Sequence, residues 1–360
     1  MHNNKSTPDL TKLRHWIILL LISFQLTAWG QMRIYDSNQL SSNLITSIAQ
    51  DGDGYIWIAT KYGLNAFDGV RFTHYFHQED DNTSIASNHV KKLFTDRNGN
   101  LWALTYKAIQ RYNPKTDQFE RANTSDNINN FKDVCQSKNN QLFVLTDQGI
   151  IEVDCQSMQA KPLSGINRMK PTKANPKFIY LDSKERLWVA NEYQVAFYDK
   201  KDKNKNIIHN QDLSSYGKIA GINEDRNGQV IVVTNTAILR QNEKNDKLEM
   251  LMPITGGIVV RRVYRNVQGD LLVGSYGNNI RKIDLENRQL VNAYQWTDWK
   301  NPWESQNVYA FCEDRDGNAW IGCYQNGLVF LSAKNNDFHY IDLRRNSFAD
   351  RKSTRVNSSH

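Results

Sequence analysis

The chain has 360 residues, of which 39% are hydrophobic, 23% charged and 11% aromatic, with 19 glycines and 7 prolines. This balance excludes a disordered or collagen-like chain, while the length allows either two average domains or one large all-β unit. The formal net charge of +7 would suit a nucleic-acid-binding protein only if it belonged to the folded part of the chain.

Residues 1–30 have the pattern of a secretory signal peptide. Three Lys or Arg residues lie between Lys5 and Arg14, an apolar run extends from Trp16 to Phe24, and small residues stand at positions 28 and 30. An uncleaved membrane anchor is the alternative, but the run is shorter than the ~20 apolar residues that a spanning helix needs. We therefore expect export and cleavage before Gln31.

A seven-residue motif, Asp-x-x-Gly-x-x-Trp, recurs along the chain and ends at an anchor residue. Clear copies occupy residues 51–57, 96–102 and 314–320, and weaker copies end at residues 143, 188, 231 and 272. The anchors are 45, 41, 45, 43, 41 and 48 residues apart, which divides the chain into seven units. The clearest repeat residues are Asp51, Gly54, Trp57, Asp96, Gly99, Trp102, Trp188, Asp314, Gly317 and Trp320.

Each unit contains four short alternating segments. In the first unit these are residues 44–48, 55–60, 64–67 and 71–75, and the last unit begins with residues 308–311. An α-solenoid of similar period would need a 3.6-residue pattern, which is absent. Four strands per unit predict an all-β fold, a seven-bladed β-propeller with four-stranded antiparallel blades over residues 31–349.

The repeat motif itself is expected to be structural. Its Asp can accept hydrogen bonds from the N–H groups of the turn, its Gly allows positive φ, and its Trp can bury a large ring against the neighbouring blade. Binding of Ca²⁺ or carbohydrate at these turns is the alternative. We predict no metal site and no cofactor.

The stretch from Ile48 to Phe72 resembles the first blade of a two-component regulator propeller, the repeat of periplasmic sensor regions in hybrid two-component systems of gut Bacteroidetes. The resemblance covers roughly residues 32–343. It is strong in blades one, two and seven and weaker where Phe143, Ile231 and Leu272 replace Trp.

The resemblance implies a ligand-sensing segment, commonly for oligosaccharides, and not a catalytic one. It implies that the full-length protein is a homodimeric hybrid histidine kinase of the inner membrane. A second propeller, an immunoglobulin-like domain, a membrane span, a kinase, a receiver and a DNA-binding helix-turn-helix would follow this segment, which itself would not contact nucleic acid.

Tyrosines recur four or five residues after the anchors. A propeller places the turns between second and third strands on the same face as the connections between blades, so these rings are expected on one rim. They could stack on sugars, or instead pack on adjacent loops and fix the turns. The five are Tyr62, Tyr106, Tyr193, Tyr276 and Tyr324.

Two further groups are candidate ligand residues. Trp296, Trp299 and Trp303 lie in the longest connection, and could form a glycan platform, a docking surface for the second propeller, or a lid. Arg261 and Arg262, expected in the preceding connection, would suit an acidic sugar.

Catalytic and metal-binding motifs are absent from the sequence. His74 and His77 would point to opposite faces of a strand, so they are not expected to share a metal. An exported propeller enzyme, such as a lyase or glycosidase acting on polysaccharide, remains the alternative function, and a scaffold without a small ligand is a third.

Four cysteines in an exported chain raise the question of disulfides. Cys135 and Cys312 are expected on first strands of non-adjacent blades, Cys155 on a third strand, and Cys323 on a second strand opposite Val308. Buried free thiols are therefore the favoured interpretation.

Residues 350–360 resemble the translation of a common sequencing-library adapter, with Val356 in place of Leu. We expect this tail to be non-native and the natural reading frame to continue differently after residue 349. Without both end segments the chain has 39 Lys or Arg and 36 Asp or Glu, a net charge of +3. That charge gives no argument for nucleic-acid binding.

Overall fold

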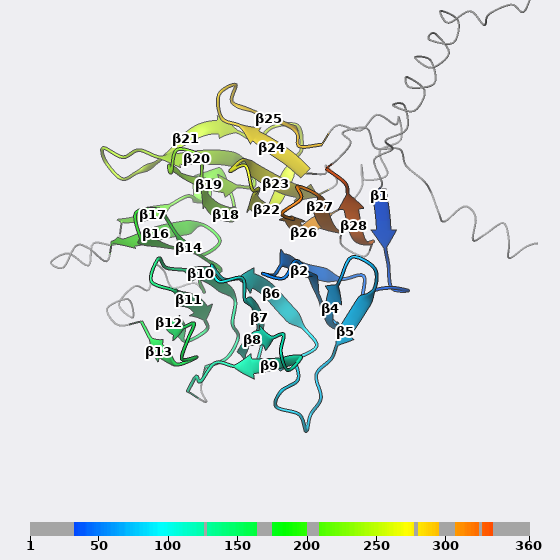
Figure 1. Cartoon of the computed structure of the whole chain (residues 1–360). Coiled ribbons are helices and arrows are strands. Elements are labelled where there is room, and N and C mark those ends of the chain that lie inside the picture. Colours follow the sequence, from blue (N-terminus) through cyan, green and yellow to red (C-terminus); the bar gives the residue numbers. More distant parts are fainter. Residues whose placement is uncertain are drawn as a thin grey trace, which may run out of the picture.

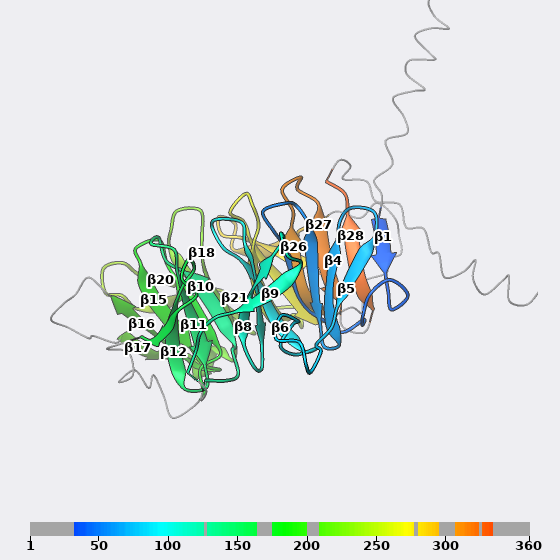
Figure 2. The same cartoon turned by 60° about the horizontal axis from the view of Figure 1, so that its bottom comes forward.

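The computed structural model describes residues 32–125, 128–163, 175–199, 209–276, 280–294, 307–323 and 326–333. These ranges form seven four-stranded antiparallel sheets and one short 3₁₀ helix, η1 (Ser214–Tyr216). The sheets stand around a central axis (Figure 1), and together they form a disc (Figure 2). The predicted seven-bladed all-β propeller is confirmed.

Blades one to six each contain four consecutive strands, which follow one another from the centre of the ring outward. Blade one is β2 (Ile45–Gln50), β3 (Ile56–Thr60), β4 (Gly63–Phe67) and β5 (Phe72–Tyr75). Blade two is β6 (Val90–Thr95), β7 (Leu101–Thr105), β8 (Ile109–Asn113) and β9 (Gln118–Arg121). Blade three is β10 (Asp133–Gln136), β11 (Gln141–Thr146), β12 (Gly149–Asp154) and β13 (Ala160–Pro162). Blade four is β14 (Phe178–Leu181), β15 (Arg186–Ala190), β16 (Gln194–Asp199) and β17 (His209–Asp212). Blade five is β18 (Ile219–Glu224), β19 (Val230–Thr234), β20 (Ala237–Gln241) and β21 (Leu248–Pro253). Blade six is β22 (Val259–Arg265), β23 (Leu271–Tyr276), β24 (Ile280–Asp284) and β25 (Gln289–Asn292).

The seventh blade is assembled from both ends of the described chain. Its first three strands are β26 (Val308–Glu313), β27 (Ala319–Cys323) and β28 (Gly327–Leu331), and its outer strand is β1 (Met32–Tyr35). The sequence had suggested four strands within each unit. Instead β1 pairs antiparallel with β28, with Met32 opposite Leu331 and Tyr35 opposite Leu328, which closes the ring without a covalent bond.

The Asp-x-x-Gly-x-x-Trp motif ties a turn to a buried ring. In blade two, Asp96 Oδ1 accepts hydrogen bonds from the backbone N–H groups of Asn98 and Asn100, at 2.9 and 3.0 Å, while Oδ2 accepts one from Trp102 Nε1 at 2.9 Å. The same indole–carboxylate bond measures 2.7 to 2.9 Å in blades one, four and seven. The motif glycines have φ values of +96°, +85° and +80° at Gly54, Gly99 and Gly317.

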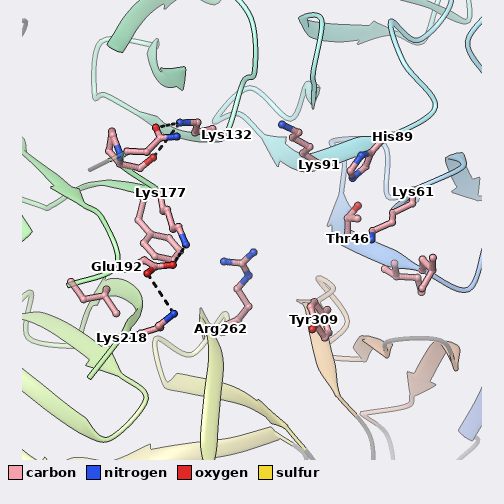
Figure 3. A pocket seen from close by; sticks show the side chains of 16 residues that line it. Thr46, Lys61, His89, Lys91, Lys132, Lys177, Glu192, Lys218, Arg262 and Tyr309 are labelled. Atoms are coloured by element: carbon pink, nitrogen blue, oxygen red, sulfur yellow. Dashed lines mark hydrogen bonds and ion pairs between the residues drawn. The ribbon is translucent and has the colours of Figure 1, made fainter. Parts of the chain in front are cut away.

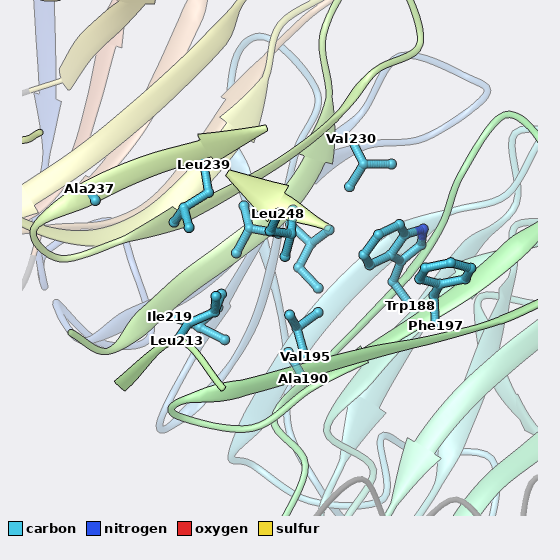
Figure 4. Packing of buried hydrophobic residues seen from close by; sticks show 12 residues of the cluster. Trp188, Ala190, Val195, Phe197, Leu213, Ile219, Val230, Ala237, Leu239 and Leu248 are labelled. Atoms are coloured by element: carbon cyan, nitrogen blue, oxygen red, sulfur yellow. The ribbon is translucent and has the colours of Figure 1, made fainter. Parts of the chain in front are cut away.

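Each anchor residue packs across the seam to the next blade. Trp57 joins a cluster with Leu93 and Phe119 of blade two, and Trp188 one with Val230 and Leu239 of blade five (Figure 4). Trp320 packs with residues of blade one, so the pattern continues around the closed ring. In blades three, five and six, where Phe143, Ile231 and Leu272 replace Trp, the smaller anchor likewise packs against residues of the following blade.

Candidate functional site

The turns between second and third strands lie on one face of the disc, because all seven blades run in the same sense. The connections between blades lie on this face too, which we call the turn face. Tyr62, Tyr106 and Tyr193 occupy such turns, and Tyr276 is the last residue of β23. These four residues are exposed, by 62%, 52%, 37% and 55%. Tyr324, Trp296, Trp299 and Trp303 lie outside the described residues.

A cavity of about 720 Å³ opens at the centre of the turn face (Figure 3). Its wall comes from the first strands and the segments just before them, and at Lys61 and Glu192 from turns between second and third strands, so every blade contributes. Six cationic side chains line it, one from each of the first six blades, together with one carboxylate, Glu192. The cations are Lys61, Lys91, Lys132, Lys177, Lys218 and Arg262.

Three of the six cations, Lys91, Lys132 and Lys177, occupy one position of the repeat, whereas Lys61, Lys218 and Arg262 occupy other positions. The residue eleven before the anchor is Lys91 in blade two, Lys132 in blade three, Lys177 in blade four and Arg261 in blade six. In blades two and six this residue sits at a β-bulge, between Val90 and Lys92 in the first case. This ring of cations was not predicted from the sequence, although the lysine at the same repeat position in blades two, three and four was a signal that could have revealed part of it.

Arg261 and Arg262 lie on the first strand of blade six, β22, and not in the connection where we expected them. The bulge between Val260 and Arg262 breaks the simple alternation of the strand. As a result the two side chains separate: Arg261 lies 5.8 Å from the Tyr276 ring centroid, whereas Arg262 lines the cavity and lies 5.8 Å from the Phe178 ring centroid.

Only part of the positive charge is neutralised by acidic partners. Glu192 forms ion pairs with both Lys177 and Lys218, the second at 3.5 Å. Lys132 pairs with Asp147 at 2.6 Å. Within the described ranges, no carboxylate lies at ion-pair distance from Lys61, Lys91 or Arg262. The cavity therefore keeps an excess of positive charge.

The rim tyrosines and the cations are coupled. Lys91 Nζ lies 3.8 Å from the centroid of the Tyr106 ring, and Lys218 Nζ lies 5.9 Å from that of Tyr193. Together with the Arg261–Tyr276 contact, three of the four described rim rings have a cation against them. The alternative, that the rings fix adjacent structure, thus takes a specific form for Tyr106, Tyr193 and Tyr276, in which the ring contacts a charged side chain.

The electrostatics of the cavity favour uncharged forms of its bases. Burial lowers the pKa of His89, and the nearby charges of Lys91 and Lys61 lower it further. Burial also lowers the pKa of Lys91, with Asp147 opposing this shift and Lys132 adding to it. His89 is consequently neutral at pH 7, and the positive charge comes from the lysines and Arg262.

Next to this cavity, an ion pair joins the first strands of neighbouring blades. Lys92 forms an ion pair with the side chain of Asp133, whose other oxygen accepts a hydrogen bond from the backbone N–H of Ile179 at 2.9 Å. This pair links the first strands of blades two, three and four.

The histidines considered for a metal site have separate partners. His74 Nδ1 lies 2.8 Å from Asn65 Oδ1, and His77 Nδ1 lies 2.9 Å from the carbonyl oxygen of Ile85. In the part of the chain that the structure describes, no three His, Cys, Asp or Glu side chains are grouped as metal ligands. The same residues include no helix with the length and apolar character to cross a bilayer.

All four cysteines are free; Cys155 and Cys323 are buried, as in the favoured interpretation, whereas Cys135 and Cys312 are only partly buried. Cys323 stands opposite Val308 as predicted, and Cys135 and Cys312 lie on first strands. Cys155 differs slightly, because it follows the last residue of β12 instead of lying within that strand.

We expect these thiols to react slowly in the native protein. Burial raises the pKa of Cys155 to about 11 and that of Cys312 to about 12, and it raises the pKa of Cys135 and Cys323 as well. Since the thiolate is the nucleophile, a disulfide reagent at pH 8 should titrate the folded chain about a hundredfold more slowly than the urea-unfolded chain. Immediate release of one equivalent from the folded chain would contradict this.

Comparison with known proteins identifies the repeat. The two component regulator propeller family matches residues 39–62 and 302–325, in blade one and at blade seven, which confirms the resemblance seen in the sequence. Among curated proteins, no sequence matches this chain significantly.

Solved structures share the propeller fold. One extracellular domain assigned to a hybrid two component system of B. thetaiotaomicron is 21% identical, with a TM-score of 0.68, over 84% of this chain and 42% of that one. A second is 18% identical, with a TM-score of 0.65, over 85% and 40%. Virginiamycin B lyase from Staphylococcus aureus is 14% identical, with a TM-score of 0.60, over 84% and 99%. The chain spans about two fifths of the length of the two extracellular domains.

Proposed function

We propose that this chain, which carries two-component regulator propeller repeats, is the periplasmic ligand-sensing propeller of a hybrid histidine kinase. The matched repeats and the likeness to extracellular domains of hybrid two-component systems support this proposal. The segment would bind its ligand and catalyse no reaction. A signal would pass across the inner membrane as a change in how propellers or dimer partners pack, through a second propeller, an immunoglobulin-like domain, a membrane span and a kinase that follow it.

The ligand proposed is an oligosaccharide bound on the turn face. The observation that carries this is the combination of a central cavity with exposed tyrosine rings around it on the same face. A tyrosine ring can cover the apolar face of a sugar while its hydroxyl forms hydrogen bonds, and a cavity of this size falls in the usual range for small ligands.

Calorimetric titration of the purified chain with a panel of neutral and acidic oligosaccharides tests the binding proposal. If a member binds, Tyr106→Ala is expected to weaken its affinity about tenfold, because the variant loses the ring surface on the rim and the ring that Lys91 packs against. Tyr55→Ala is the matched control. Tyr55 is also exposed, but it lies in the Asp51 turn on the opposite face.

Two results would count against this function. Failure of every oligosaccharide to bind the folded chain would contradict the proposal that this propeller binds oligosaccharides. Equal losses in the Tyr55 and Tyr106 variants would remove the turn face as the site. The receptor part is tested separately by the genomic sequence after codon 349: a membrane span with a kinase supports it, and a stop codon soon after blade seven contradicts it.

A further inference from the structure

The charge on the turn face is distributed by the fold and not by a basic stretch of sequence. The six cations of the cavity come from six blades, so successive members are 30 to 45 residues apart along the chain. Figure 3 shows the Arg262 guanidinium extending into the middle of the space between Lys91 and Lys218. Seven-fold closure therefore gathers onto one cavity a charge that the sequence disperses.

Gathering like charges in this way is unfavourable for the empty protein. Each cation raises the electrostatic energy of the others, which is the reason that Lys132 lowers the pKa of Lys91. Glu192 and Asp147 offset part of the repulsion, but Lys61, Lys91 and Arg262 lack such a partner among the described residues. A ligand carrying negative charge would relieve this repulsion on binding.

The tyrosine contacts argue for the same ligand chemistry. Lys91 lies against the Tyr106 ring and Lys218 against the Tyr193 ring, so a neutral sugar stacking on those faces would first have to displace a cation. An anionic group need not displace the cation, because it binds the cation itself, which the ring holds in position. The rings then act by positioning the charges.

We infer that the central cavity is a site for an acidic oligosaccharide, whose sulfate or carboxylate groups are bound by Lys61, Lys91 and Arg262. This inference rests on the function proposed above and names the chemical class of its ligand. The lysines supply point charges to an anion of any shape. The planar guanidinium of Arg262 can bind a sulfate or a carboxylate through two parallel hydrogen bonds.

Calorimetry with three probes on the full chain tests the inference. They are a sulfated, uronate-containing tetrasaccharide, the same sugar after removal of sulfate and reduction of its carboxyl groups, and inorganic tripolyphosphate. We expect the charged sugar to bind at least about tenfold more tightly than the neutral one. Raising the NaCl concentration from about 0.05 to about 0.5 M should weaken the affinity for the charged sugar about tenfold.

Two variants locate the binding. Arg262→Gln is expected to weaken the affinity for the charged sugar about tenfold and to leave the affinity for the neutral sugar unchanged. Lys107→Gln is the matched control, because Lys107 is an exposed cation in the β7–β8 turn on the same face and does not line the cavity. The Lys107→Gln variant should bind the charged sugar with an affinity within about twofold of that of the parent chain.

The outcomes separate this inference from the proposed function. Tight binding of the neutral sugar, without preference for charge, would keep the sensing proposal and overturn the acidic class. Equal losses in the Arg262 and Lys107 variants would place the acidic ligand elsewhere. Tripolyphosphate binding as tightly as the charged sugar would show that charge alone is recognised, and would overturn the assignment to a saccharide.

Discussion

Gly327→Ala is expected to lower the free energy of unfolding by about 3 kcal/mol, because it disturbs the contact that closes the ring. Gly327 has a φ of +79°, and a Cβ atom there would stand 2.2 Å from the backbone carbonyl oxygen of Tyr35. That oxygen belongs to β1, so the backbone of either β1 or β28 must shift. Both strands are needed to complete blade seven.

Urea unfolding followed by circular dichroism measures the loss, and Gly69→Ala provides the control. Gly69 also has positive φ, at +98°, but a Cβ atom there would meet nothing within 4 Å. Its replacement should cost only the backbone strain, about 1 kcal/mol. Equal losses in the two variants would show that the contact with Tyr35 carries no weight in closure.

Asp96→Ala is expected to cost a similar amount, about 3 kcal/mol, because a buried donor loses its partner together with two turn amides. Trp102 is fully buried, and its Nε1 hydrogen is donated to the carboxylate of Asp96. The indole packs into blade three alongside Val134 and Leu142. Loss of the carboxylate should therefore loosen the seam as well as the turn.

Asp68→Ala is the control for the turn alone. Asp68 Oδ1 accepts backbone hydrogen bonds from Val70 and Arg71, each at 2.8 Å, in a solvent-exposed turn without a buried indole. Thermal unfolding of both variants should show a clearly larger decrease in Tm for Asp96→Ala. If the decreases are equal, the indole bond contributes nothing beyond the turn. Asp96→Asn keeps one acceptor oxygen and should fall between the two.

Local features made the blades predictable. The distance from Asp51 to Trp57 fixes a turn and the strand after it, so the strands expected at 55–60 and 64–67 are observed as Ile56–Thr60 and Gly63–Phe67. The same spacing set the turn positions of Tyr62 and Tyr106. Turn and strand are specified within about ten residues of each motif, which a single sequence can reveal.

Long-range features were not predictable in the same way. The pairing of β1 with β28 joins segments almost three hundred residues apart, and no local pattern in residues 32–35 identifies β28 as the pairing strand. Arg261 and Arg262 were misplaced because the long first strand β22 begins earlier than its alternation suggests, and a bulge hides the pattern. The full set of cavity cations could not be predicted, because Lys61, Lys218 and Arg262 occupy different repeat positions and only closure of the ring brings them together.

The geometry of blade seven makes this ring a good subject for circular permutation. Leu331 stands opposite Met32 just as Phe67 stands opposite Phe72, and in blade one four residues, 68–71, bridge such a pair. A linker of that length should join residue 331 to residue 32. New ends between β8 and β9 would then make β9 the first strand of the rearranged chain. The ring would close in blade two, where the N-terminal β9 would pair with the C-terminal β8 as β1 now pairs with β28 in blade seven.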